Sequence, residues 1–311
     1  MKTRPLGQNG IQVSAMCMGT AYFGSKTDRE TSFALLDQYR AAGGSFLDSA
    51  NCYASWVAGS NGGDSERLLG EWIQERGNRG DLFIATKVGI AYPEAEPGLA
   101  EWQIVDECEK SLKRLNTDYI DLYYAHLDDR NTTLDETLHA FDKLVKSGKV
   151  RYIGASNYQA WRLEEAHWVS QRNSLAEYCC VQNHYTYLRP RPGAEFSYWG
   201  VGNEELFDYC EARGLAFLAY STLLGGAYVR KDRRLWDKYS GPHSRERLST
   251  LRSVAQDIGA SPNQVVLAWM MQSKVPALPV IGVSKPEQLT ENLGALGVNL
   301  TPEIMQRLNQ G

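Results

Sequence analysis

Four polar residues stand where the chain has the spacing of an active site. Asp48, Lys87 and His126 each end a short apolar run with the character of a β-strand, and Tyr53 follows shortly after Asp48. In a barrel of alternating strands and helices, the C-terminal strand ends face one common mouth, where chemistry takes place. The spacing therefore predicts a carboxylate, a phenol, an ammonium and an imidazole around one site.

Such a set suits the reduction of a carbonyl group by hydride. Negative charge builds on the carbonyl oxygen during this reaction, so a positioned acid must supply a proton. We expect Tyr53 to be that acid, with Lys87 within about 4–6 Å lowering the phenol pKa from its ordinary value of about 10. Asp48 would pair with Lys87, and His126 would orient the carbonyl oxygen. The chemistry needs no metal, and the sequence shows no cluster of metal ligands.

Each of the four residues also has a simpler explanation. Asp48 could be a helix cap, Tyr53 a core or rim residue, Lys87 a solvated charge and His126 a hydrogen-bonded structural histidine. Taken one by one, these explanations are favoured. Their joint placement on consecutive strand ends favours the active site instead.

The elements that must position these residues alternate along the chain, which predicts βα units and a parallel sheet. Eight strands are expected, the number of a closed (β/α)8 TIM barrel. They lie at 13–17, 46–48, 82–87, 119–126, 151–155, 178–182, 215–220 and 277–281. Helices are expected at 29–42, 64–75, 102–115, 134–146, 160–169, 204–213, 244–258 and 262–271. Asp28 and Asp64 are the expected N-caps of the first two helices, and Pro286 would open the last helix.

The segments outside these strands and helices predict an N-terminal hairpin and several long loops, all within a single domain. Asn9-Gly10 between two short alternating runs is a strong signal for a β-hairpin ahead of the barrel. No linker rich in Pro, Gly or Ser divides the chain, so residues 1–311 are expected to form a single domain. The loops after the third, sixth and seventh strands are longer than usual barrel connections, and long structured loops are usually functional.

Composition narrows the function further. The 311 residues are 43% hydrophobic and carry a net charge of −4 without a block of like charges, so a nucleic-acid partner is not expected. The start has no apolar signal region, and no apolar stretch is long enough to span a membrane. The six cysteines form no Cys-x-x-Cys pair. We therefore expect a reduced, cytoplasmic protein.

Three segments around the four residues resemble the aldo-keto reductase family. They read GGSFLDSANCY at 43–53, ATK at 85–87 and YYAH at 123–126, and KVRYIGASN at 149–157 is similar to a fourth family segment. The resemblance covers nearly the whole chain. It implies an NADPH-dependent oxidoreductase with a (β/α)8 barrel that binds its cofactor in an extended form, without a Rossmann fingerprint.

A nicotinamide needs its carboxamide hydrogen-bonded and its ring supported on one face. Ser156, Asn157 and Gln182 offer the donors and acceptors for the carboxamide. Tyr220, which ends the seventh strand, is a flat platform for the ring. The segment STLLGG at 221–226 follows, and its backbone amides could approach a pyrophosphate. The cofactor residues expected there are Ser221, Leu223 and Gly225.

The segment IGVSKPEQ at 281–288 resembles the adenosine-phosphate segment of the family. A helix N-terminus with adjacent Ser284 and Lys285 suits an anionic 2′-phosphate. Gly282 and Gln288 are expected to bind the cofactor with them. Some relatives carry an additional basic residue at one of these two positions, so NADH as a secondary cofactor stays open. The resemblance places Glu291 and Asn292 against the adenine.

Aromatic and polar loop residues predict the substrate pocket. The expected substrate-binding residues are Tyr22, Trp56, Asp128 and Arg189, and further wall candidates are Tyr92, Asp129, Tyr198, Trp199 and Tyr228. Aromatic walls with a few charged groups suit a sugar or another small polyhydroxylated carbonyl compound. The physiological carbonyl, the favoured direction and the oligomeric state are not determined by the sequence.

Two other functions remain open at this point. Potassium channel β-subunits resemble this family and serve as channel partners, although the chain shows no docking extension. A (β/α)8 lyase could instead use Lys87 as a Schiff base, which would require a neutral lysine, whereas a close Asp48 would keep it protonated.

Overall fold

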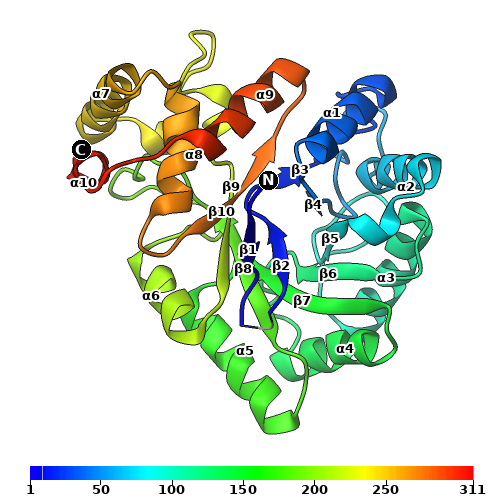
Figure 1. The fold of residues 1–311 in the computed structure, drawn as a ribbon. Coiled ribbons are helices and arrows are strands. Elements are labelled where there is room, and N and C mark those ends of the chain that lie inside the picture. Colours follow the sequence, from blue (N-terminus) through cyan, green and yellow to red (C-terminus); the bar gives the residue numbers. More distant parts are fainter. Residues whose placement is uncertain (9, 311) are drawn as a thin grey trace.

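The computed structural model describes residues 1–8 and 10–310, and its centre is a closed barrel of eight parallel strands (Figure 1). The strand order around the barrel is β10-β3-β4-β5-β6-β7-β8-β9. The strands are β3 Cys17–Gly19, β4 Phe46–Asp48, β5 Phe83–Val88, β6 Ile120–Ala125, β7 Val150–Ser156, β8 Tyr178–His184, β9 Ala216–Tyr220 and β10 Ala277–Gly282. The predicted (β/α)8 TIM barrel is confirmed.

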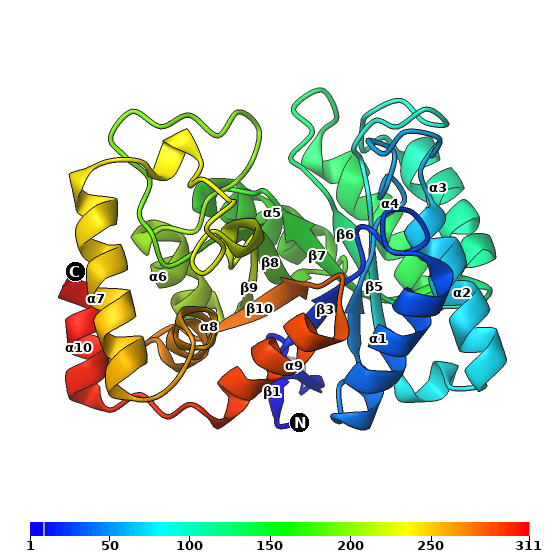
Figure 2. The ribbon, with the colours of Figure 1, turned by 90° about the horizontal axis from the view of Figure 1, so that it is seen from above.

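Helices form an outer layer around the strands, as Figures 1 and 2 show. Over the described residues they are α1 Arg29–Ala41, α2 Asp64–Arg76, α3 Glu101–Leu115, α4 Leu134–Lys146, α5 Ala160–Asn173, α6 Glu204–Arg213, α7 Pro242–Asp257, α8 Pro262–Gln272, α9 Pro286–Gly294 and α10 Pro302–Gln310. The strands are buried along nearly their whole length because helices cover their outer face and side chains fill the barrel. No helix in the described ranges is long and apolar enough to cross a membrane.

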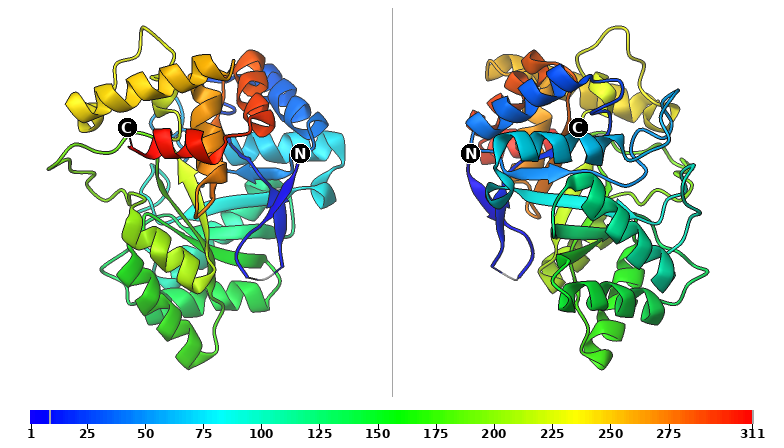
Figure 3. Two further views of the ribbon diagram at one scale, coloured as in Figure 1. Left: turned by 60° about the vertical axis from the view of Figure 1, so that its left-hand side comes forward. Right: turned by 90° about the vertical axis from the view of Figure 1, so that its right-hand side faces the viewer.

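The predicted N-terminal hairpin closes one end of the barrel. Strands β1 Thr3–Pro5 and β2 Gln12–Ser14 pair antiparallel, and Leu6 and Val13 pack into the cluster that fills the barrel interior. Asn9 of the expected turn lies outside the described residues. In Figure 3 the hairpin is dark blue and lies on the opposite side of the barrel from the long loops. Those loops therefore surround the remaining open end.

Three details of the predicted elements are wrong. The expected strand at 13–17 is divided, because its first part pairs with β1 and the barrel strand begins only at Cys17. Asp64 does not cap α2; it is the first helical residue, and Gly63 with φ +74° is the cap. The helix that Pro286 opens is not the last, because Pro302 begins α10.

The long loops gather at the C-terminal ends of the strands. They span 49–63 after β4, 89–100 after β5, 185–203 after β8 and 221–241 after β9. Figure 2 shows them along the edge of the molecule opposite the hairpin. The residues with predicted chemistry lie on these loops or on the strand ends below them.

Candidate active site

The four predicted residues meet at one point of the barrel mouth, and Lys87 on β5 is at their centre. Its Nζ donates to Asp48 Oδ2 at 2.6 Å, to the Ser49 carbonyl oxygen at 2.7 Å and to Tyr53 Oη at 2.8 Å. A lysine ammonium has three N–H donors, so these three acceptors satisfy all of them. The geometry is that of a protonated lysine held by its neighbours.

The O–H group of Tyr53 has only a long contact to an acceptor within the protein. Its oxygen accepts from Lys87, while its own O–H faces Asp48 Oδ2 at 3.4 Å. This second separation is longer than the 2.5–3.0 Å typical of an O–H···O hydrogen bond. The phenol proton is therefore available to an oxygen that approaches from the mouth.

Asp48 is held from both sides of its carboxylate. Gln182, on the far side of the barrel on β8, donates to Oδ1 at 2.9 Å, while Lys87 occupies Oδ2. Both Asp48 and Lys87 are fully buried. An ion pair in such a place persists only with its lone pairs and protons satisfied, as they are here.

The pKa of Tyr53 moves in the direction opposite to the one expected from the sequence. Burial raises the pKa of Tyr53 well above 10, and the Asp48 carboxylate raises it further. The expected lowering by Lys87 is wrong because burial disfavours the charged phenolate, and because Asp48, 2.6 Å from Lys87, offsets the positive charge of the lysine. Tyr53 is therefore a neutral phenol at physiological pH, which is the form that can donate a proton.

His126 follows β6 and is also buried. Burial, and then the positive charge of Lys87, hold the pKa of His126 well below 6.5. Its Nδ1 lies 3.8 Å from Cys52 Sγ, and its ring is 6.1 Å from that of Tyr53. A neutral imidazole in this position can orient a carbonyl oxygen, while Tyr53 is better suited to supply the proton.

Asn157 connects the predicted nicotinamide residues. Its Nδ2 donates to the His126 carbonyl oxygen at 2.8 Å and to Ser156 Oγ at 3.2 Å. Its Oδ1 accepts from the Gly200 amide at 3.0 Å and from Tyr220 Oη at 2.8 Å. The side chain thus joins the ends of β6, β7 and β9 to the loop 185–203, and it is fully paired within the protein.

The predicted phosphate residues lie at two places. Ser221 and Gly225, with φ of +57° and +65°, belong to the loop after β9, where Leu223 packs against the core. Lys285 is the exposed N-cap residue of α9, next to the exposed Gly282 and Ser284. Gln288 accepts from the Ser284 amide at 2.8 Å, which orders this turn.

The two predicted adenine residues are more enclosed. Glu291 accepts hydrogen bonds from Ser261 at 2.6 Å and Asn263 at 3.3 Å, which ties α9 to the start of α8. Asn292 is buried. Glu291 thus has a structural role in the described chain, and Asn292 contributes little exposed surface.

Some of the predicted substrate residues lie at the barrel mouth, and others are engaged in contacts within the protein. Trp56 is 53% exposed, and its ring lies 5.9 Å from that of Tyr53 and 6.1 Å from that of Tyr22, so these three rings form an aromatic rim. Asp128 instead pairs with Arg162 at 2.8 Å and with Arg130. Its role as a contact for substrate hydroxyls stays a prediction, for a carboxylate that two arginines already engage.

The other wall candidates separate in the same way. Tyr92 and Tyr228 are buried, and their hydroxyls bond to Glu107 and Thr186. Asp129 accepts hydrogen bonds from the backbone amide of Leu99, in the loop 89–100, and from the hydroxyl of Thr132, in its own loop. The exposed candidates are Arg189, Tyr198 and Trp199.

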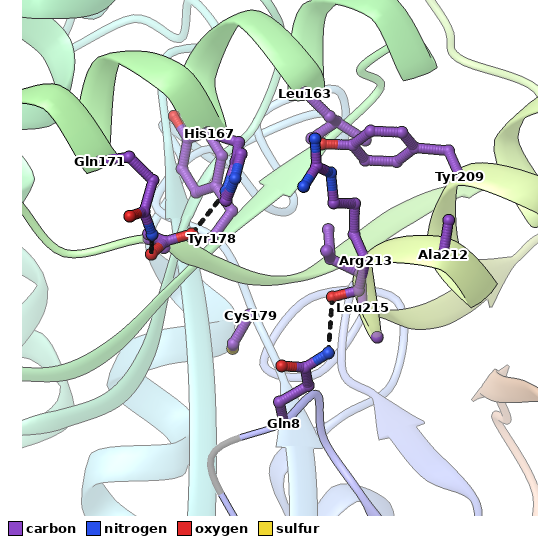
Figure 4. Close-up of a pocket in the computed structure, with 12 residues that line it drawn as sticks. Gln8, Leu163, His167, Gln171, Tyr178, Cys179, Tyr209, Ala212, Arg213 and Leu215 are labelled. Carbon is purple, nitrogen blue, oxygen red and sulfur yellow. Dashed lines mark hydrogen bonds and ion pairs between the residues drawn. The ribbon is translucent and has the colours of Figure 1, made fainter.

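A second pocket, shown in Figure 4, is lined by none of the four residues. It is formed between α5, α6 and the hairpin loop, and its lining includes His167, Cys179 and Arg213. Gln8 of the hairpin donates to the Arg213 carbonyl oxygen at 3.1 Å. Since Cys179 stands at the beginning of β8 and Gln182 further toward its C-terminal end, this pocket belongs to the opposite end of the barrel from the candidate active site.

The comparison with protein families decides the classification. The family model of the aldo/keto reductase family matches residues 15–310. The chain belongs to the aldo/keto reductase family. The resemblance to this family that the sequence motifs indicated is thereby confirmed.

Individual relatives of this aldo/keto reductase are oxidoreductases. It is 33% identical to an uncharacterized oxidoreductase of Bacillus subtilis over 98% of this chain and 94% of that protein. It is 33% identical to a norsolorinic acid reductase of Emericella nidulans, over 94% of this chain and 77% of that protein. It is 30% identical to an NADP(+) aryl-alcohol dehydrogenase of Phanerodontia chrysosporium, over 96% of this chain and 81% of that protein. A crystal structure of a thermostable aldo-keto reductase with the inhibitor epalrestat superposes with a TM-score of 0.80 at 30% identity, covering 100% and 99% of the chains.

Two groups of this aldo/keto reductase site were missed by the sequence reasoning. The Ser49 carbonyl oxygen is a ligand of Lys87, and no side-chain pattern can indicate a backbone acceptor. Glu107 is a buried carboxylate on α3 that bonds to the loop carrying Tyr53. A signal for Glu107 was present, because it falls on the buried face of its helix together with Ile104, Cys108 and Ser111.

Proposed function

We propose that this protein is an NADPH-dependent oxidoreductase that reduces an aldehyde or a ketone to the alcohol, with Tyr53 as the general acid. The observation that carries the proposal is the arrangement around Lys87. The lysine donates to Tyr53 Oη at 2.8 Å, which leaves the phenol proton with only a long contact to Asp48. A protonated phenol next to a fixed ammonium suits proton transfer to a developing alkoxide.

The donor set at the mouth fits a nicotinamide cofactor. Ser156, Gln182 and Asn157 offer hydroxyl and amide groups near the catalytic residues, and Tyr220 offers a half-buried ring held by its bond to Asn157. When bound, the reduced cofactor supplies the hydride. Because Asn157 is already fully paired, it would act by fixing Tyr220 and Ser156 for the cofactor, in addition to any direct contact.

Four protein residues have separate roles in the proton transfer to the substrate. His126, neutral because of burial, orients the carbonyl oxygen. Tyr53 transfers its proton to that oxygen, and the phenolate that remains accepts the hydrogen bond from Lys87 more strongly than the phenol did. Asp48 and the Ser49 carbonyl oxygen keep Lys87 in place during this change.

The same contacts support the reductase over a Schiff-base lyase. A lysine that forms a Schiff base needs a free lone pair on nitrogen, whereas Lys87 uses its three protons on three acceptors. Borohydride treatment with a carbonyl substrate should trap no adduct on Lys87. A trapped adduct would favour the lyase.

The rim of the mouth favours an aromatic substrate. Exposed Trp56 next to Tyr53 and Tyr22 offers rings for stacking, whereas Asp128, the acidic group expected to hold sugar hydroxyls, is paired with two arginines. The names of two relatives, a norsolorinic acid reductase and an aryl-alcohol dehydrogenase, agree with this choice. A small polyhydroxylated carbonyl compound is the alternative to be tested beside it.

The direct test is a panel of aromatic aldehydes, ketones and sugars assayed by the loss of NADPH absorbance, with NADH in parallel. We expect turnover of aromatic aldehydes with NADPH. The absence of turnover with every carbonyl compound and both cofactors would contradict the proposal and would favour a non-enzymatic role like that of channel β-subunits.

Replacing Lys285 by alanine should weaken NADPH binding much more than NADH binding. The lysine is exposed at the N-cap of α9, where helix and side chain both attract a 2′-phosphate. A charge-assisted contact of about 1.5–3 kcal/mol corresponds to roughly tenfold to a hundredfold in Kd. Fluorescence titration with both cofactors measures the difference, and equal losses for both would assign Lys285 another role.

Replacing Trp56 by alanine should raise the KM for benzaldehyde and change the KM for glyceraldehyde little. Loss of an aromatic contact of about 0.5–1.5 kcal/mol corresponds to roughly a two- to tenfold increase in KM. Steady-state kinetics with the two substrates gives the comparison. A larger effect on glyceraldehyde would support the sugar alternative, and proportional losses would show that Trp56 only packs the loop onto the barrel.

A further inference from the structure

A buried carboxylate behind the active site joins two loops of the barrel mouth. Glu107 on α3 accepts through Oε2 from Asn51 Nδ2 at 2.7 Å and from Tyr92 Oη at 2.8 Å. Asn51 belongs to the loop 49–63 that carries Tyr53, and Tyr92 belongs to the loop 89–100. One carboxylate oxygen therefore holds both loops at a single point.

The groups around this point are closely packed. Asn51, Tyr92 and Glu107 are all buried, and a Cβ atom added to Gly62 would lie 2.7 Å from the Tyr92 ring. The ring packs in a small cluster with Ala50 and Cys52, the latter directly before Tyr53. Neither loop can shift here without breaking contacts in the other.

Asn51 also ties this point to the catalytic lysine. Its backbone amide donates to the Lys87 carbonyl oxygen at 3.2 Å, while its side chain reaches Glu107. The residue thus spans from β5 to α3, two positions before Tyr53. The separation between Tyr53 Oη and Lys87 Nζ depends on where this segment is held.

We propose that Glu107 is a positioning residue, which fixes the loop 49–63 so that Tyr53 stays in register with Lys87. Lys110 pairs with the outer oxygen Oε1 of Glu107 at 2.8 Å, and Arg114, which pairs with Glu66 at 2.6 Å, lies 4.0 Å from the inner oxygen Oε2. The carboxylate therefore presents its inner oxygen to two neutral donors on the loops. This inference rests on the proposed function, since it assigns Glu107 to the proton transfer from Tyr53.

The variant that tests the inference is Glu107→Gln. Glutamine has the same shape, but its neutral amide oxygen is a weaker acceptor than a carboxylate oxygen, and its N–H2 group would face the Lys110 ammonium. The bonds from Asn51 and Tyr92 therefore lose their charge assistance and hold the two loops less firmly. We expect kcat for aldehyde reduction to fall by about 10- to 100-fold, the effect of a small displacement of a catalytic group. Cofactor Kd should stay unchanged, and the basic limb of the pH profile should move, because the phenol has shifted relative to Lys87 and Asp48.

Two further variants provide controls. Lys110→Met removes the contact to the outer oxygen Oε1 and leaves both loop contacts in place, so kcat should match that of the wild type. Tyr92→Phe keeps the ring against Gly62 and removes one of the two donors, so its kcat should lie between those of the wild type and Glu107→Gln.

Hydrogen exchange of the peptide 49–63 provides a measurement that needs no substrate. Exchange in this segment should increase in Glu107→Gln and stay at the wild-type level in Lys110→Met. If Glu107→Gln lowers the melting temperature but leaves kcat, the pH profile and exchange in 49–63 unchanged, Glu107 has only a general structural role and the inference is overturned. If the wild-type protein reduces no carbonyl compound, the proposed function fails, while the exchange data still decide whether Glu107 holds the loop.

Discussion

Replacing Tyr53 by phenylalanine is expected to lower kcat for carbonyl reduction by about 10²–10⁴-fold, the range for a lost general acid. The change removes the oxygen to which Lys87 donates at 2.8 Å, together with the proton that the proposed mechanism transfers to the substrate. The ring itself remains between Trp56 and His126, so the shape of the mouth is kept. The measurement is kcat at saturating NADPH and aldehyde.

The cofactor gives the matching control for this variant. Binding of NADPH should be the same in Tyr53→Phe and in the wild type, because the proposed cofactor residues lie on β7, β8, β9 and the following loops. An unchanged kcat would show that another group supplies the proton. His126 would be the next candidate, although burial holds its pKa low and so disfavours the charged donor form.

Replacing Lys87 by methionine is expected to have a comparable effect on kcat and to move the basic limb of the reductive pH profile to higher pH. In the proposed mechanism Tyr53 must carry its proton to act, and its pKa is already raised by burial and by Asp48. Without the ammonium, the Asp48 charge acts on the phenol uncompensated and raises the pKa of Tyr53 further. A higher pKa keeps the proton bound to a higher pH, which sets the direction of the shift.

Stability measurements separate the charge effect from the chemistry. Removing one partner of a buried ion pair costs about 3–5 kcal/mol, so Lys87→Met should be less stable to urea than the wild type. The double variant Asp48→Asn/Lys87→Met has no unpaired charge and should regain part of that stability without regaining turnover. A pH profile of the same shape but lower height in Lys87→Met would mean that the lysine only positions its neighbours.

Much of the architecture and the centre of the site could be predicted from the sequence. Strand periodicity and the polar residues at the strand ends were enough to bring Asp48, Lys87 and His126 together, because parallel strands in a barrel present these ends to one face. The position of Tyr53 at the same site could be predicted because it lies only five residues after Asp48 in the sequence. These relations depend on local pattern and topology, which a single sequence carries.

Other features depend on distances that the sequence does not contain. The pKa of Tyr53 is raised first because its side chain is buried and then because Asp48 lies beside it, and the sequence shows neither the burial nor this contact. The pairing of Asp128 with Arg162 was missed because the two residues lie 34 positions apart on different elements. The division between β2 and β3 was missed because the apolar pattern continues through Ala15 and Met16, both of which are buried.

The hydrogen bond from Gln182 to Asp48 has a consequence for how the protein reaches its active form. It joins residues 134 positions apart, from opposite sides of the barrel. Contacts between such distant positions form late and slowly, because the chain must lose much of its freedom before they can be made. During refolding, the circular dichroism signal of the helices should therefore return before enzymatic activity. The delay between the two would measure how long the barrel takes to close after its helices have formed.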